Sequence, residues 1–156
     1  MRLFLECRPD ETLAMVLGVP RKAIVHSHSK GRVAKSLATH SGVAGMVDED
    51  FGEKEPLSFR RYSEVSFTHD VRLRLDSERK NRLVVVCPRL EPWLMKTAKV
   101  ANVEMGRFGL PTNLRDLDAD INYRLPSLER LLNALLEAKS PRLLHLRALL
   151  LPQPSD

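Results

Sequence analysis

The first half of the sequence predicts an α/β fold built around a parallel β-sheet. Three short apolar runs, at residues 2–7, 23–27 and 43–47, alternate with two segments that have helical periodicity. Runs that are apolar throughout are typical of parallel strands, because such strands are buried on both faces. Short connections between alternating strands and helices favour a parallel βαβαβ core covered by helices.

The two helices of this core have recognisable ends. We expect Asp10 to be the N-cap of the first helix, which ends at Gly18. The second helix begins at Ser29 or Gly31 and ends at Gly42.

The remaining residues predict a hairpin and helices added to this core. Residues 51–61 are polar and contain Gly and Pro, which indicates a loop. Strands are expected within 63–70, over 71–76 and over 82–88, followed by a helix that Pro92 begins. We expect 102–122 to be irregular and two helices to follow, 127–138 capped by Ser127 and 141–151. The chain is interpreted as one domain, 1–156, with a core over about 1–100 and a helical extension over about 101–151.

Composition narrows the class of protein. The chain has 156 residues, of which 43% are apolar and 29% charged, as in a soluble globular domain. No apolar run reaches the roughly 18 residues of a membrane helix, and the N-terminus does not resemble a signal peptide. Two cysteines without a CxxC pair disfavour a disulfide framework or a structural zinc site. We therefore expect a cytoplasmic protein with no membrane partner.

The net charge of +5 is concentrated in one part of the chain. Residues 79–107 hold seven basic residues and only two acidic ones, Glu91 and Glu104. A local basic excess near acidic groups is what a protein that binds a phosphate backbone needs, although a solvated basic surface has the same composition. The residues expected to contact nucleic acid are Arg82, Arg89, Lys96 and Lys99.

The segment GMVDEDFG, residues 45–52, holds three consecutive acids after an apolar run. In an extended chain Asp48 and Asp50 point to the same side while Glu49 turns away. Two adjacent carboxylates repel unless a cation lies between them, and Mg²⁺ or Mn²⁺ suits hard oxygen ligands. A solvated acidic turn is the alternative.

Glu6 strengthens the metal interpretation because it follows the first predicted strand. The carboxyl ends of parallel strands meet at one edge of a sheet, where ligands bind in α/β folds. Glu6, Asp48 and Asp50 are therefore expected at the same edge. The alternative for Glu6 is an ion pair with Arg8.

The sequence also contains the residue types of two other kinds of site, a histidine metal site and a cysteine nucleophile. His26 and His28, with His40 or His69, have the residue types of a zinc or iron site, or they are plain polar residues at the sheet edge. Cys7 lies at the expected edge as a possible nucleophile, but acidic neighbours raise the pKa of a thiol and disfavour that role.

The segment LFLEC, containing Glu6, and the later GMVDED together resemble the TOPRIM domain family. Its signature is a Glu after the first strand and Asp-x-Asp after the third, which correspond to Glu6, Asp48 and Asp50. SKGRV, with Lys30, is similar to a lysine-containing turn of the overcoming-lysogenization-defect type nucleases. PRLEPWL is similar to another segment of those nucleases, whose glutamate joins the metal site and corresponds to Glu91. The resemblance covers about residues 1–100.

The resemblance implies a Rossmann-like TOPRIM core and a Mg²⁺- or Mn²⁺-dependent hydrolase that cleaves phosphodiesters in nucleic acid. Asp48, Asp50, Glu6 and Glu91 would bind metal, Glu6 would be a ligand or a general base, and Lys30 would stabilise transition-state charge. A topoisomerase would need a nucleophilic tyrosine in a suitable partner domain, and Tyr62 and Tyr123 are the only tyrosines.

The sequence also departs from the family pattern. Cys7 stands where many members have Gly, Arg32 where Asn is usual, and Pro92 where Asn or a similar residue is common. The alternative function is a non-catalytic module that binds metal, nucleotide or nucleic acid together with a partner protein or as a homodimer.

Overall fold

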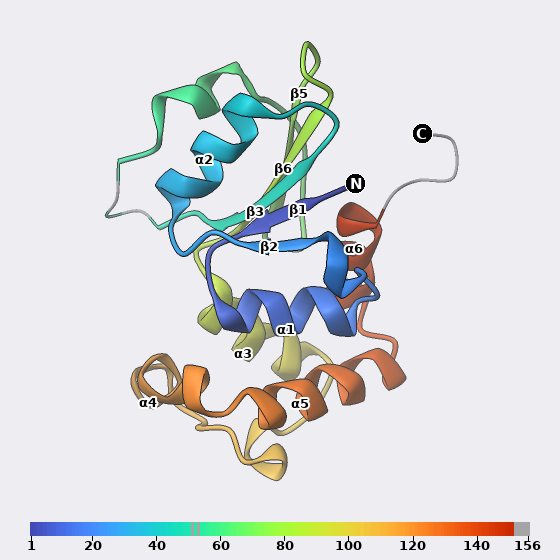
Figure 1. The fold of residues 1–156 in the computed structure, drawn as a ribbon. Helices are drawn as coiled ribbons and strands as arrows, with labels where there is room; N and C mark the ends of the chain where they lie inside the picture. The colour runs from blue at the N-terminus through green and yellow to red at the C-terminus, as the bar shows by residue number, and fades with distance from the viewer. Residues whose placement is uncertain (51, 53, 152–156) are drawn as a thin grey trace.

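A mixed six-stranded sheet forms the centre of the molecule (Figure 1). The computed structural model describes residues 1–50, 52 and 54–151. The strand order is β2-β1-β3-β6-β5-β4. Strands β2, β1, β3 and β6 are parallel, while β5 and β4 are antiparallel additions at one side. The strands are β1 (Leu3–Leu5), β2 (Ile24–His26), β3 (Ala44–Asp48), β4 (Ser63–Thr68), β5 (Val71–Asp76) and β6 (Asn81–Val86).

Helices cover both faces of the sheet. They are α1 (Arg8–Val16), α2 (Lys30–Thr39), α3 (Leu90–Val100), α4 (Leu114–Asp120), α5 (Leu125–Glu137) and α6 (Pro141–Leu150). Figure 1 shows α2 on one side of the sheet, α1 and α3 on the other, and α4 and α5 as a further layer beyond α1 and α3. The predicted α/β class and the parallel pairing of the first three strands are confirmed.

Alternating side chains along each strand divide the core in two. Leu3, Leu5, Met46 and Val84 pack with α1, α3, α5 and α6 on one face of the sheet. Phe4 and other side chains of opposite orientation pack with α2 and the short 3₁₀ helix η2 (Leu57–Arg61) on the other face. Because each parallel strand is covered on both faces, its residues are apolar at successive positions.

Two predicted helix starts are wrong by a few residues. Helix α1 begins at Arg8 with Cys7 as its N-cap, so Asp10 lies inside the first turn and is buried rather than capping. Pro9 explains the earlier start, since proline fits the first turn of a helix. Helix α5 begins at Leu125, again with proline in its first turn, and Ser127 is buried within it.

One further predicted helix start is wrong, and one open choice of helix start is resolved. Helix α3 begins at Leu90, two residues before Pro92. Ser29 caps α2 by accepting a hydrogen bond from the Arg32 amide at 3.1 Å, which resolves the choice between Ser29 and Gly31.

The expectation that 102–122 is irregular is wrong. This segment contains the 3₁₀ helix η3 (Met105–Phe108), α4 and the start of η4 (Ile121–Tyr123). Asn113 caps α4 by accepting from the Asp116 amide, a pattern of capping residue and acid that the sequence displays. The predicted loop 51–61 ends in η2, while Phe51 and Glu53 lie outside the described residues.

Among the helices that the structure describes, none has the length and apolar character needed to cross a membrane.

Candidate metal centre

The carboxyl ends of β1 and β3 meet at the point where the chain reverses its direction of travel across the sheet. From β1 the chain crosses through α1 to β2 on one side, and from β2 it returns through α2 to β3 on the other side. Such a reversal leaves a crevice outside the strand ends, which is where α/β proteins bind ligands. Glu6 follows β1 directly and Asp48 is the last residue of β3.

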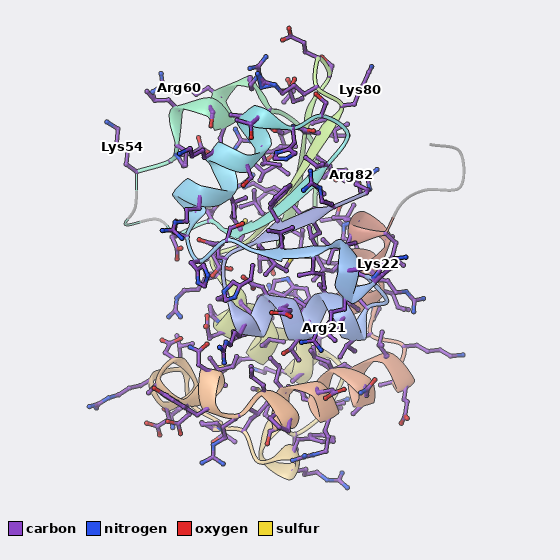
Figure 2. All side chains as sticks on the ribbon, viewed as in Figure 1. Arg21, Lys22, Lys54, Arg60, Lys80 and Arg82 are labelled. Carbon is purple, nitrogen blue, oxygen red and sulfur yellow. The ribbon has the colours of Figure 1, made fainter. Side chains whose placement is uncertain are left out.

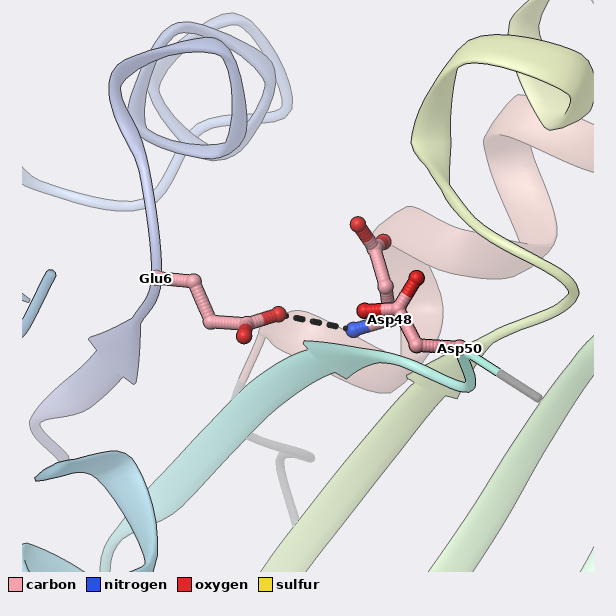
Figure 3. Close-up of side chains that lie close together, drawn as sticks. All are labelled: Glu6, Asp48 and Asp50. Atoms are coloured by element: carbon pink, nitrogen blue, oxygen red, sulfur yellow. Dashed lines mark hydrogen bonds between the residues drawn. The ribbon is translucent and has the colours of Figure 1, made fainter. Parts of the chain in front are cut away.

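The three carboxylates predicted to share this edge converge there (Figure 3). Glu6, Asp48 and Asp50 each present an oxygen, and these oxygens all lie within 4.8 Å of one another. The Glu6 carboxylate is positioned by the backbone, because the Asp48 amide donates a hydrogen bond to Glu6 Oε2 at 2.9 Å. That contact joins the ends of two adjacent parallel strands.

The backbone at Asp50 differs from the extended chain that was expected. Asp50 has φ of +48°, in the left-handed region, which Asp tolerates better than most residues. Its amide donates to Pro88 O at 3.0 Å, and this bond anchors the turn to the segment after β6. Glu49 points away from the cluster as predicted, and its Oε2 accepts from Arg72 Nε at 3.1 Å.

Lys30 reaches the cluster from the first residue of α2. Its side chain is 8% exposed, and Nζ lies 3.8 Å from Asp50 Oδ2. Nζ also donates to the backbone oxygen of Glu49 at 3.1 Å. A buried ammonium group is thereby held beside the carboxylates, as the predicted role of Lys30 requires.

Asp10 is a further acid at this edge that the sequence analysis assigned to helix capping. It is 1% exposed and accepts a hydrogen bond from Cys7 Sγ at 3.1 Å. Burial, together with the charge of Glu6, raises its pKa to about 7. Asp10 lies four residues beyond Glu6, in the first turn of the helix after β1, and this sequence position fits a capping acid equally well.

Glu91 lies in the first turn of α3 and faces the same cluster. Burial raises its pKa, and its charge contributes to the raised pKa of Asp48. Arg89 Nη1 lies 3.4 Å from Glu91 Oε2 and also pairs with Asp118 of α4. Glu91 is therefore partly neutralised by a neighbouring cation.

Burial and neighbouring carboxylates act together on Asp48. Burial, followed by the carboxylates of Asp10 and Glu6, raises the pKa of Asp48 to about 9. The carboxyl group is thus protonated at neutral pH in the absence of a cation. A bound metal ion would take the place of that proton.

The donor set fits a hard divalent cation. All ligand atoms in the triad are carboxylate oxygens, the type that Mg²⁺, Mn²⁺ and Ca²⁺ prefer. Oxygens on opposite sides of Mg²⁺ are roughly 4.2 Å apart, given bond lengths of about 2.1 Å. The observed spread of up to 4.8 Å would close around an ion through small side-chain movements.

The four basic residues expected to contact nucleic acid are separated by the fold. Arg89 and Lys96 lie on the α3 side of the carboxyl end of β6, and Lys96 Nζ pairs with Asp70 Oδ2 at 2.8 Å. Lys99 is exposed in the last turn of α3. Arg82 lies near the amino end of β6, away from the cluster, and donates to Leu149 O at 2.9 Å (Figure 2).

The other candidate residues do not assemble into sites. Among the described residues, Glu6, Asp48 and Asp50 form the only group of three or more side chains close enough to hold a metal ion, so the histidines form no such cluster. His26 stacks on His28 with ring centroids 4.2 Å apart. Burial and the charge of Asp10 raise the pKa of the Cys7 thiol, which disfavours a nucleophilic thiolate.

Tyrosine chemistry is not supported at this edge either. The Tyr62 side chain is buried, and its hydroxyl accepts from Asn81 Nδ2 at 3.3 Å on the α2 side of the sheet. Tyr123 is 87% exposed in η4.

Comparison of the chain with protein-family models, curated protein sequences and solved structures finds no match.

Proposed function

We propose that this chain is a divalent-metal-dependent protein that cleaves phosphodiesters in nucleic acid and has a Rossmann-like TOPRIM core. The observation that supports this most is the convergence of Glu6, Asp48 and Asp50 within 4.8 Å at the switch point of the parallel strands. Lys30, held at 3.8 Å from Asp50, adds the cation that phosphoryl chemistry uses.

The proposed ligands are Glu6, Asp48 and Asp50, with Asp10 and Glu91 completing the acidic surroundings. Mg²⁺ or Mn²⁺ bound there would polarise a phosphodiester and lower the pKa of a bound water. Glu6 has a second proposed role as general base, because its carboxylate lies beside those of Asp48 and Asp50 at the strand ends. Lys30 places positive charge where a phosphate oxygen would gain negative charge.

The test is a cleavage assay on end-labelled single-stranded and duplex DNA and RNA with Mg²⁺ or Mn²⁺. We expect the double variant Asp48→Asn/Asp50→Asn to lose cleavage by about two orders of magnitude or more, since even outer-shell changes at metal sites cost roughly 10–100-fold. Glu129→Gln on α5 is the control acid and should cleave like the wild type. Cleavage retained by the double variant, with both variants folded by circular dichroism, would refute the proposal.

A second candidate is a non-catalytic module that binds metal, nucleotide or nucleic acid and acts with a partner protein. The Arg89–Glu91 ion pair favours it, because a cation already occupies one side of the acidic cluster. A wild-type chain that binds Mn²⁺ but cuts none of the substrates would support this candidate. Arg89→Gln would then be expected to tighten metal binding without creating cleavage.

A further inference from the structure

A second concave surface lies along the same edge of the sheet, beyond β6. Because β5 and β4 alternate in direction, the carboxyl end of β4, the amino end of β5 and the carboxyl end of β6 all lie at the edge that carries Asp48. A groove of about 360 Å³ runs there between the β4–β5 turn and α3. Glu49 lines both this groove and the neighbouring cleft that contains Asp48 and Lys30. The groove therefore continues toward the candidate metal centre.

The charged side chains that line the groove form two groups. Lys96 and Arg142 both pair with Asp70 Oδ2, each at 2.8 Å, so one carboxylate faces two cations. Arg142 is 4% exposed, and its Nη2 has no hydrogen-bond partner among the residues that the structure describes. Arg72 is shared by Glu49 and by Glu64 of the neighbouring cleft. The excess of positive charge thus lies beside Lys96 and Arg142, where an anion is favoured.

An exposed aromatic ring lies in the groove next to Arg72. Phe67 is 46% exposed on β4, and the Arg72 guanidinium lies 3.9 Å from the centre of its ring. That contact supports one face of the ring. A large exposed aromatic side chain backed by a cation, next to a cationic groove, is the arrangement with which proteins stack unpaired bases and follow a phosphate backbone.

We infer that the groove binds single-stranded nucleic acid, with an unpaired base on Phe67 and a phosphate beside Lys96 and Arg142. This inference rests on the proposed function and specifies its substrate class. A duplex keeps its base faces stacked inside the helix except at its two ends, so it offers Phe67 far fewer faces to stack on than a single strand does. The strand would continue past Glu49 toward Asp48 and Asp50.

The experiment is fluorescence anisotropy of the full-length chain with a labelled 12-nucleotide oligothymidine, in EDTA and about 50 mM salt. The comparison ligands are a blunt duplex of equal length and an abasic strand with the same phosphates. We expect the single strand to bind at least about fivefold more tightly than either, the order of one base–aromatic stack. Phe67→Ala should lose that advantage, whereas Val65→Ala, at an exposed neighbouring position on β4, should bind like the wild type.

Lys96→Gln provides an independent readout. Removing one phosphate contact should reduce the slope of log affinity against log salt concentration by about one. Lys22→Gln, before the amino end of β2, is the matched control and should leave the slope unchanged.

Failure of this inference is distinguishable from failure of the proposed function. Duplex or abasic strand bound as tightly as the single strand, or full binding by Phe67→Ala, would overturn the inference while leaving metal binding by Asp48 and Asp50 unaffected. Loss of binding in Phe67→Ala with unchanged calorimetry for Mn²⁺ would support it. Because the binding assay contains EDTA, single-strand binding can be observed even if the chain does not cleave nucleic acid.

Discussion

Asp48 carries a carboxyl group whose charged form is disfavoured by the fold. It is half-buried, and the carboxylates of Asp10, Glu6, Glu91 and Asp50 all raise its pKa. Repulsion of this kind is tolerated in proteins where a cation or a proton relieves it. The stability of the metal-free protein should therefore depend on pH.

We expect the metal-free protein to lose stability as pH rises. The pKa of Asp48 is raised from 3.8 to about 9 and that of Asp10 from 3.8 to about 7, so the folded state binds more protons than the unfolded state between these limits. The free energy of unfolding then falls as pH increases from about 4 to 9. Urea unfolding in EDTA at pH 5, 7 and 9 measures this trend.

Asp48→Asn is the matched variant for that prediction. It removes the titrating carboxyl and the repulsion, so it should flatten the pH dependence and be more stable than the wild type at pH 9. Saturating Mn²⁺ should stabilise the wild type more at pH 9 than at pH 5, because fewer protons compete for the carboxylates. A wild type more stable at pH 9 than at pH 5 in EDTA would contradict this account.

Sequence alone identified most of this site because its chemistry follows strand ends. Glu6, Asp48 and Asp50 could be placed at one edge from the order of apolar runs. Asp10 could not, because an acid after proline at the start of a helix has the same pattern whether it caps the helix or faces inward. Only the packing of α1 against the sheet decides between these positions.

At the scale of elements, close packing of α2 on β3 positions Lys30. A Cβ atom added at Gly45 would lie 3.0 Å from both Leu37 Cδ1 and Val33 Cγ1 of α2. Glycine at this position in β3 therefore allows the helix to approach the sheet. The first residue of the same helix carries the ammonium group beside Asp50.

Gly45→Ala should destabilise the protein by about 1–3 kcal/mol, the usual range for overpacking a core. Gly31→Ala, in the exposed first turn of α2, meets only Ser29 Oγ at 3.9 Å and should instead stabilise by about 0.5 kcal/mol. Denaturant unfolding of both variants provides the comparison. Equal stability of Gly45→Ala and the wild type would show that α2 can shift at little cost.

The types of the helices and strands were predictable from the sequence, whereas their exact boundaries were not. Periodicity of apolar residues distinguishes α1, α2 and the strands, because each element must bury one face. The exact first residue depends on which cap forms, as Cys7 and Arg124 show by preceding α1 and α5 without a side-chain capping hydrogen bond. Helix α4 is too short for periodicity to identify it.

At the scale of the whole molecule, Arg142 connects the last helix to distant parts of the chain. It donates to Thr97 Oγ1 of α3 and to Asp70 Oδ2 of the β4–β5 turn, both at 2.8 Å, and lies 5.0 Å from the centre of the Trp93 ring. Removing one member of a buried ion pair costs roughly 3–5 kcal/mol. Asp70 is 33% exposed and keeps Lys96, so we expect the lower end of that range for Arg142→Ala.

Lys96→Ala is the control for this prediction, because it removes the exposed partner of the same carboxylate. Lys96→Ala should lower the free energy of unfolding by less than about 1 kcal/mol, as for other surface ion pairs. Comparable losses in the two variants, measured by urea unfolding, would contradict the buried role of Arg142.

The arrangement of charge over the molecule was the least predictable feature. The basic residues of 79–107 are close in sequence, but Arg82 lies near the amino end of β6 and Arg89 lies beyond its carboxyl end, so about 13 Å of strand stands between them. Asp70 and Asp118, which pair with Lys96 and Arg89, come from other parts of the chain. Local composition thus identifies a basic segment of the sequence, but the topology of the sheet determines which of its cations lie on the same surface.

Isothermal titration calorimetry with Mg²⁺ and Mn²⁺ measures whether Glu6, Asp48 and Asp50 bind a divalent cation. The wild type should bind at least one ion, with proton release that grows below pH 9 because Asp48 must deprotonate. Asp48→Asn/Asp50→Asn should show no binding, and Glu129→Gln should match the wild type. Absence of binding in the wild type, or binding that survives in the double variant, would contradict the metal centre.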